Sequence, residues 1–379
     1  MRFRLFLALG LWAAAARASS VSDELSVYNT AAGPQTPQSG NVSDSLRAAV
    51  DLSDQWSVNA SATVTAQGQT PAAAKGEFGT TGNLVSLFSL GADFAPSDNW
   101  TVGASFDFSP QSTQYAGTQV LLTEFTSTRP VRACTFPNPD PGCQVDNALL
   151  RSQASELAGA ANVSYDTAGD SDLEWAFDAD FTFTHLDTLQ KIAELRGPGG
   201  ALASPLQIRD FCRVSPKKCP HALLNVLGEQ DAPLDFERLS LSATATAWRD
   251  TDFTLSGDYY VYDEDPATVG YFTAIFPGRS SEAGGNGVAI APVQWDVRAD
   301  AAQKFGDFSV KLWLQAGEYA AGTGQSTTAL GLKLQYKITK HFKVWASLTG
   351  QKDVGEPDST GVAQTTNSSV VSMGAGYRF

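Results

Sequence analysis

Charged side chains of opposite sign occupy separate parts of the sequence. The first group is acidic and lies between residues 83 and 185: Asp93, Asp107, Glu156, Glu174, Asp178 and Asp180. The second group is mainly basic and lies between residues 291 and 352: Arg298, Lys304, Lys311, Lys333, Lys337 and Lys343. Charges that line a narrow aqueous passage sort ions by sign and solutes by polarity. These two groups therefore predict such a passage, provided that the fold places each group on one face.

Residues suited to covalent catalysis are few. The chain has three histidines, His185, His221 and His341. Only His185 has a carboxylate beside it, Asp187, and a histidine at the end of a strand accounts for that spacing without any chemistry. We expect neither an enzyme nor a cofactor.

The elements that would position the charged groups are strands that follow a recurring turn. In each version a tight polar turn precedes an aromatic residue or a leucine, which opens a segment of alternating apolar and polar residues. The six versions are Leu52–Val58, Pro96–Val102, Gly169–Trp175, Trp248–Leu255, Phe305–Val310 and Ile338–Val344. They predict six short hairpins.

Alternation read outward from these turns predicts about fourteen strands of the length that a tilted strand needs to cross a bilayer. They are expected at residues 23–31, 44–53, 56–66, 83–95, 100–109, 153–166, 172–185, 235–248, 253–263, 291–305, 307–319, 327–338, 342–352 and 368–379. On this reading the apolar face meets lipid and the charged face lines the interior. A soluble β-sandwich is the alternative, with the apolar residues in its core.

The N-terminus has the pattern of a removable signal peptide. Arg2 and Arg4 precede an apolar run, and Ala16-Arg17-Ala18 resembles a cleavage site. We expect a signal peptide at residues 1–18 and a single mature domain at residues 19–379. The formal net charge of the whole chain is −14, so a nucleic-acid partner is not expected.

Four cysteines in an exported chain predict disulfides. Sequence proximity favours the pairs Cys134–Cys143 and Cys212–Cys219 among the three possible pairings. A metal site at Cys212, Cys219 and His221 would have only three ligands, so we expect no metal.

The last ten residues alternate as well, and they end on Phe379 with Tyr377 two places before it. A final strand that ends on an aromatic residue resembles the closing strand of bacterial outer-membrane β-barrels. The resemblance implies that Tyr377 and Phe379 are read by the barrel insertion machinery. It also implies an all-β, antiparallel, up-and-down barrel in the outer membrane, with short periplasmic turns, long extracellular loops, and lipid and lipopolysaccharide around it.

Two predicted loops, residues 110–152 and 186–234, are long enough to have a function of their own. Each contains one of the cysteine pairs. The apolar spacing within His185–Arg196 predicts a short helix in the second loop, and His221–Leu227 a further helical piece.

The opposed charges resemble those of general porins, in which an inward-folded loop narrows the bore. The resemblance implies a passive channel for small polar solutes or ions. The negative net charge of the chain separately predicts a weak preference for cations. Two alternatives remain open: a closed barrel that displays its loops as an adhesin or receptor, and a transporter of hydrophobic compounds. An apolar lumen would favour the last. The large aromatic residues that alternation places inside are Tyr260, Tyr262, Trp313 and Trp345.

Overall fold

The computed structural model describes thirteen segments of the chain. They are residues 20–30, 39–67, 83–120, 145–167, 173–196, 202–203, 205–214, 229–231, 233–247, 251–264, 293–320, 326–357 and 363–379. The expected signal peptide lies outside these residues. No helix in the described segments is long and apolar enough to cross a membrane.

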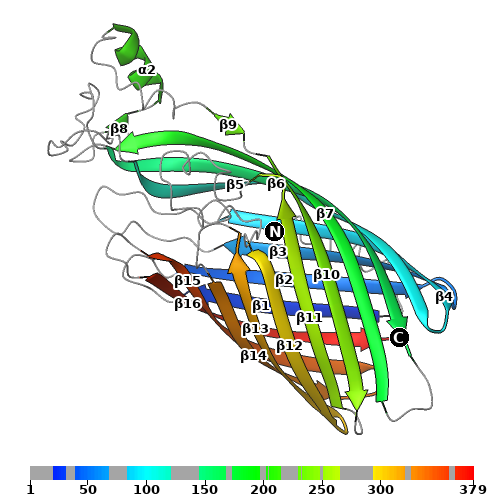
Figure 1. Ribbon diagram of the computed structural model, residues 1–379. Coiled ribbons are helices and arrows are strands. Elements are labelled where there is room, and N and C mark those ends of the chain that lie inside the picture. The colour runs from blue at the N-terminus through cyan, green and yellow to red at the C-terminus, as the bar shows by residue number, and fades with distance from the viewer. Residues whose placement is uncertain are drawn as a thin grey trace.

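Fourteen long antiparallel strands form the wall. They are β1 (Ser20–Thr30), β2 (Ser39–Asp51), β3 (Trp56–Gln67), β4 (Asn83–Ser97), β5 (Trp100–Val120), β6 (Val145–Asp166), β7 (Leu173–Arg196), β10 (Leu234–Ala247), β11 (Thr251–Tyr262), β12 (Val293–Phe305), β13 (Phe308–Tyr319), β14 (Ser326–Lys337), β15 (Phe342–Pro357) and β16 (Ala363–Arg378). Each strand pairs with its neighbour in sequence order, and β7 pairs with β10. The first and last strands pair from Ser20↔Arg378 to Thr30↔Ser368, which closes the sheet into a barrel (Figure 1).

The tight turns gather at one end of the barrel, here called the turn end, and the long connections at the other, the loop end (Figure 1). Two of the turns use the same hydrogen bonds. The Ser53 hydroxyl accepts the N–H of Trp56 at 3.1 Å, and the Thr339 hydroxyl accepts the N–H of Phe342 at 3.0 Å. The hairpin between β12 and β13 instead uses Gly306 at a positive φ of 63°, which favours glycine. In these two turns, the local bonds account for the hydroxyl side chain three places before the aromatic residue.

Large apolar side chains occupy alternate positions on the outer face of the wall. On β13, Leu312 and Leu314 are 52% and 59% exposed, whereas Trp313 between them is 9% exposed. Ring pairs Trp56–Phe94 and Trp100–Tyr165, each with centroids 4.7 Å apart, lie on this outer face beside the turns. An apolar outer face with aromatic rings at its margin is the pattern of a barrel in lipid.

Three strands are much longer than expected. β5, β6 and β7 continue past the barrel wall at the loop end (Figure 1). Residues 110–120 and 145–152, predicted as loop, belong to β5 and β6. The helix predicted at His185–Arg196 is wrong, because these residues continue β7 and pair with β6 through Asn147↔Arg196.

Small elements complete the loop end. β8 (Leu202–Ala203) and β9 (Gln230–Asp231) both pair with β7. The helix α2 (Pro205–Val214), which was not predicted, begins at a proline, a residue favoured in the first helical turn. The helical piece predicted at His221–Leu227 lies outside the described residues. So do Cys134, Cys143, Cys219 and the side chain of Cys212, and the two disulfides stay a prediction.

Candidate channel lumen

The inner face of the barrel carries both charged groups. The acidic positions lie on β4 to β7, on the face opposite the lipid-facing row, together with Asp252, Asp258 and Asp296 on β11 and β12. Asp93 accepts a hydrogen bond from the Asn59 amide at 3.1 Å, and Asp178 accepts one from the Ser242 hydroxyl at 2.9 Å. Polar neighbours therefore hold several of these carboxylates.

An arginine that the sequence reading missed lies among the acids. Arg238 on β10 donates to Asp180 at 3.0 Å and to the Thr182 hydroxyl at 3.1 Å. Tyr260 on β11 lies directly across from it. The acidic group predicted from the sequence therefore has a base paired with one of its members, Asp180. The alternating pattern of β10 places Arg238 on the inner face, so its lumenal position could have been predicted from the sequence.

Part of the basic group is neutralised by ion pairs. Asp300, 8% exposed, binds Arg298 at 2.7 Å and Lys311 at 3.1 Å. Lys304 pairs with Asp252 at 3.6 Å. Two of these bases, Arg298 and Lys304, lie on β12, next to the acidic strand β11. In the barrel, the predicted basic wall is therefore confined to the strands from β13 onward.

Two lysines flank one lumenal tryptophan on the remaining basic wall. The ammonium nitrogens of Lys333 and Lys343 are 5.1 and 5.8 Å from the centroid of Trp345. The indole lies over Gly374 of the neighbouring strand and donates a 2.8 Å hydrogen bond to Glu24 on the strand after that. Lys337 lies opposite Lys343 at the turn end. Trp345 thus bridges β15 to β1 across the closing strand β16.

The loop end of the lumen holds an apolar cluster, here called the mouth patch. Ala154, Leu186 and Leu234 form its buried part, and Phe236 and Tyr262 pack against them. The ring centroids of Phe236 and Tyr262 are 5.6 Å apart. Tyr260 adds a third ring, stacked on Tyr262 with centroids 6.3 Å apart. The Tyr262 hydroxyl donates to the carbonyl of Val293 at 2.9 Å, which fixes the ring.

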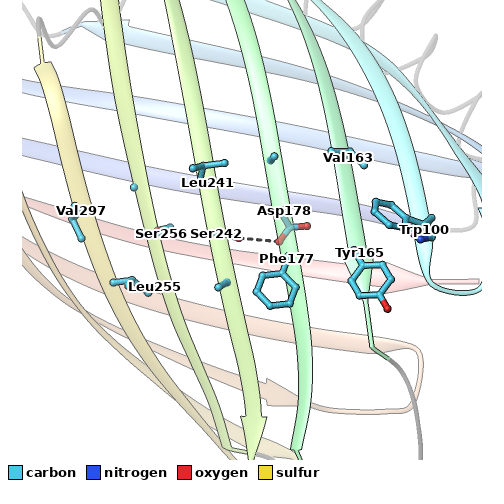
Figure 2. A pocket seen from close by; sticks show the side chains of 13 residues that line it. Trp100, Val163, Tyr165, Phe177, Asp178, Leu241, Ser242, Leu255, Ser256 and Val297 are labelled. Atoms are coloured by element: carbon cyan, nitrogen blue, oxygen red, sulfur yellow. Dashed lines mark hydrogen bonds between the residues drawn. The ribbon is translucent and has the colours of Figure 1, made fainter.

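A shallow hollow of about 600 Å³ lies across β5 to β7 and β10 to β12 (Figure 2). Most of the residues that line it belong to the lipid-facing rows of the strands. Phe177, Leu241 and Leu255 are large, whereas Ala179 and Gly257 are small and leave the space between them. The hollow therefore opens toward lipid and lies outside the lumen.

A histidine and three acids meet at the loop-end rim of the outer face. The Nδ1 atom of His185 contacts Asp235, and its Nε2 atom lies 3.3 Å from Asp187. Asp263 accepts the backbone N–H of Asp235 at 3.0 Å. The lipid-facing apolar row of β7 ends at Phe183, so this group lies above the membrane-spanning part of the strand.

Similarity to proteins of known structure agrees with this geometry. No protein-family model and no curated sequence matches the chain. A FadL homologue of Pseudomonas aeruginosa superposes with a TM-score of 0.55 at 13% identity, over 95% of this chain and 89% of that one. The toluene transporter TodX of Pseudomonas putida gives 0.53 at 10% identity, over 95% and 89%. The toluene transporter TbuX of Ralstonia pickettii gives 0.51 at 11% identity, over 96% and 90%.

The chain is a bacterial outer-membrane β-barrel by fold. At sequence identities this low, the similarity establishes the fold and nothing further. In this barrel the turn end is periplasmic and the loop end extracellular, as the arrangement of short turns and long loops predicts.

The carboxy-terminal aromatic residues lie at the periplasmic end of the outer-membrane barrel. Tyr377 belongs to the lipid-facing row of β16, and its ring contacts that of Phe379 edge to face, with centroids 4.8 Å apart. Phe379 is 64% exposed. Recognition of these two residues by the insertion machinery stays a prediction.

Proposed function

We propose that this barrel is a passive outer-membrane channel for small hydrophobic and amphipathic compounds. The mouth patch is the observation that carries the proposal. An apolar compound gains free energy when it leaves water for a surface of Leu186, Phe236 and Tyr262, at about 25 cal/mol per Å² of apolar area removed from water. Transport would then be diffusion down a gradient, with no covalent step.

Three similar structures support this choice, because two are described as toluene transporters and one as a FadL homologue. The channel for polar solutes, expected from the charges, becomes the second candidate. Its support is the part of the basic wall that has no ion pair among the described residues, at Lys333 and Lys343. Several other lumenal charges are ion-paired: Asp180, Asp252, Asp300, Arg238, Arg298, Lys304 and Lys311.

The test is toluene entry into vesicles whose outer leaflet contains lipopolysaccharide, since a plain phospholipid bilayer is a weak barrier to an apolar solute. We expect the barrel to accelerate toluene entry, and Phe236→Ser with Tyr262→Ser to remove most of the acceleration. Tyr259→Ser is the matched control, because Tyr259 is the neighbouring lipid-facing tyrosine of β11.

The opposite result would favour the porin hypothesis. In that case a sugar of similar size would enter faster than toluene, and the Phe236 and Tyr262 substitutions would leave toluene entry unchanged. A barrel that passes neither solute would favour the closed display scaffold.

A further inference from the structure

The lysines at Trp345 form a concentrated positive charge near the periplasmic exit. Lys343 follows Phe342, the first residue of β15 after its turn. Arg47, Lys311 and Lys343 all act electrostatically on Lys333, and Glu24 opposes them. Glu24 is already engaged by the indole N–H of Trp345. Positive charge is therefore in excess at this height of the lumen.

Neither ammonium group has a carboxylate partner in the described part of the chain. Lys311 pairs with Asp300, whereas Lys333 and Lys343 contact the ring of Trp345. The face of Trp345 offsets part of their mutual repulsion, because a cation over an indole is attracted by the negative face of the ring. An anion bound beside these ammonium groups would offset the rest of that repulsion.

The position of Trp345 keeps this charge accessible from the bore. Its indole lies flat over Gly374, which has no side chain to lift it from the wall. The Lys343 side chain is exposed, and Lys333 is half-buried beside it. A ligand in the lumen can thus reach both ammonium groups.

We propose that Lys333 and Lys343 bind the carboxylate of organic acids with an apolar body, aromatic carboxylates in particular, before these leave at the periplasmic end. The apolar body is inferred from the mouth patch, so this part rests on the proposed function. A solute that meets Phe236 and Tyr262 first and these lysines last needs both an apolar part and an anionic part.

The test compares benzoate with benzyl alcohol, which has the same ring and no charge. Both are followed into lipopolysaccharide-containing vesicles that carry the full barrel. We expect Lys333→Gln with Lys343→Gln to raise the half-saturating benzoate concentration by about fivefold per ammonium group, the factor for one close charge pair in water. Benzyl alcohol entry should not change. Lys352→Gln is the control on the same strand, on the lipid-facing row.

Binding is measured separately, by calorimetric titration of the detergent-solubilised barrel with benzoate. Loss of benzoate binding in the double variant, with binding retained in Lys352→Gln, supports the site even where no vesicle entry is seen, and only the proposed function then fails. Unchanged benzoate binding in the double variant overturns the inference. If inorganic phosphate binds as tightly as benzoate, the proposal that the ligand has an apolar body is overturned. Lys343→Gln alone, at an exposed side chain, serves as the second variant should the double variant not fold.

Discussion

The indole of Trp313 lies over the α-carbon of Gly331, its directly paired residue on the next strand. Trp345 lies over Gly374 in the same way. Both large rings therefore lie along the wall instead of across the bore. A barrel can hold tryptophan side chains on its inner face without closing the bore, provided that the neighbouring strand has a glycine beneath each ring.

Replacing Gly331 by alanine should narrow the bore. A methyl group at this position would overlap the six-membered ring of Trp313, so the ring must move into the lumen or the strand must shift. We expect a lower single-channel conductance and a stability loss of about 1–3 kcal/mol, the usual cost of overpacking. Gly350→Ala is the control, since an added methyl group there meets open space. Equal conductance of the two variants would contradict the arrangement.

The two faces of β13 can be distinguished with one pair of neighbouring substitutions. Leu314→Arg places a charge in lipid and should destabilise the folded barrel by about 2–4 kcal/mol if the site lies near the bilayer midplane. Gln315→Arg places the same charge in the lumen, beside Asp296, and should cost much less. Unfolding by denaturant in lipid vesicles measures both. If Gln315→Arg were the more harmful change, the assignment of the faces would be inverted.

Removal of the arginine in the acidic wall should increase cation preference. Arg238→Gln leaves Asp180 without its ion pair and removes a positive charge that acts on Asp258 and Asp296 nearby. The reversal potential under a salt gradient should shift further toward that of a cation-selective pore. Arg213→Gln, in α2 beyond the barrel wall, is the control. A reversal potential that does not respond to Arg238→Gln would show that Asp180 lies away from the ion path.

The rim histidine should titrate at a higher pH than an ordinary histidine. The hydrogen bond to Asp235 is the main cause that raises the pKa of His185, and Asp187 adds to it, while partial burial opposes both. The protonated form is therefore favoured in the folded barrel. Its stabilising effect is present below the ordinary pKa and is lost as the pH rises through the raised value.

NMR titration of histidine-labelled protein measures this pKa, with His185→Gln to assign the signal. Asp235→Asn should lower the pKa of His185 more than Asp187→Asn does. The opposite order would mean that the Asp235 hydrogen bond does not control the titration.

The strand set could be predicted because each strand has one face in lipid and one toward the lumen. This alternation is local, and it placed Leu312, Trp313 and Leu314 on the correct sides without any tertiary information. The recurring turns added the hairpin pairing, because Ser53 and Thr339 bond within their own turns.

The helix predicted at His185–Arg196 shows where local reading fails. Leu186 and Ile192 are buried on β7, and a register shift opposite Leu149 and Leu150 skips Ala193. The shift changes which residues share a face only beyond Ile192, and the apolar spacing before it does not reflect one buried face. The decisive factor was pairing with β6, which is not encoded in the segment itself.

The sequence predicted which charged residues face the lumen, but it did not predict which of them form ion pairs. Inward alternation located Asp180 and Lys311, but their partners Arg238 and Asp300 depend on which strands are neighbours and by how much they are offset. The mouth patch was missed for the same reason: Ala154, Leu186 and Leu234 come from three strands, and the second of them had been placed in a helix.

The bridge from Trp345 to Glu24 also bears on how the barrel folds. It joins residues that are 321 positions apart in sequence, across the intervening strand β16. Contacts of such separation are slow to form, because the intervening chain must first lose its freedom. The bridge can therefore assemble only after β16 has docked against β1. We expect barrel closure to be a late step in folding. After closure, the hydrogen bond of Trp345 to Glu24 should slow the separation of β16 from β1.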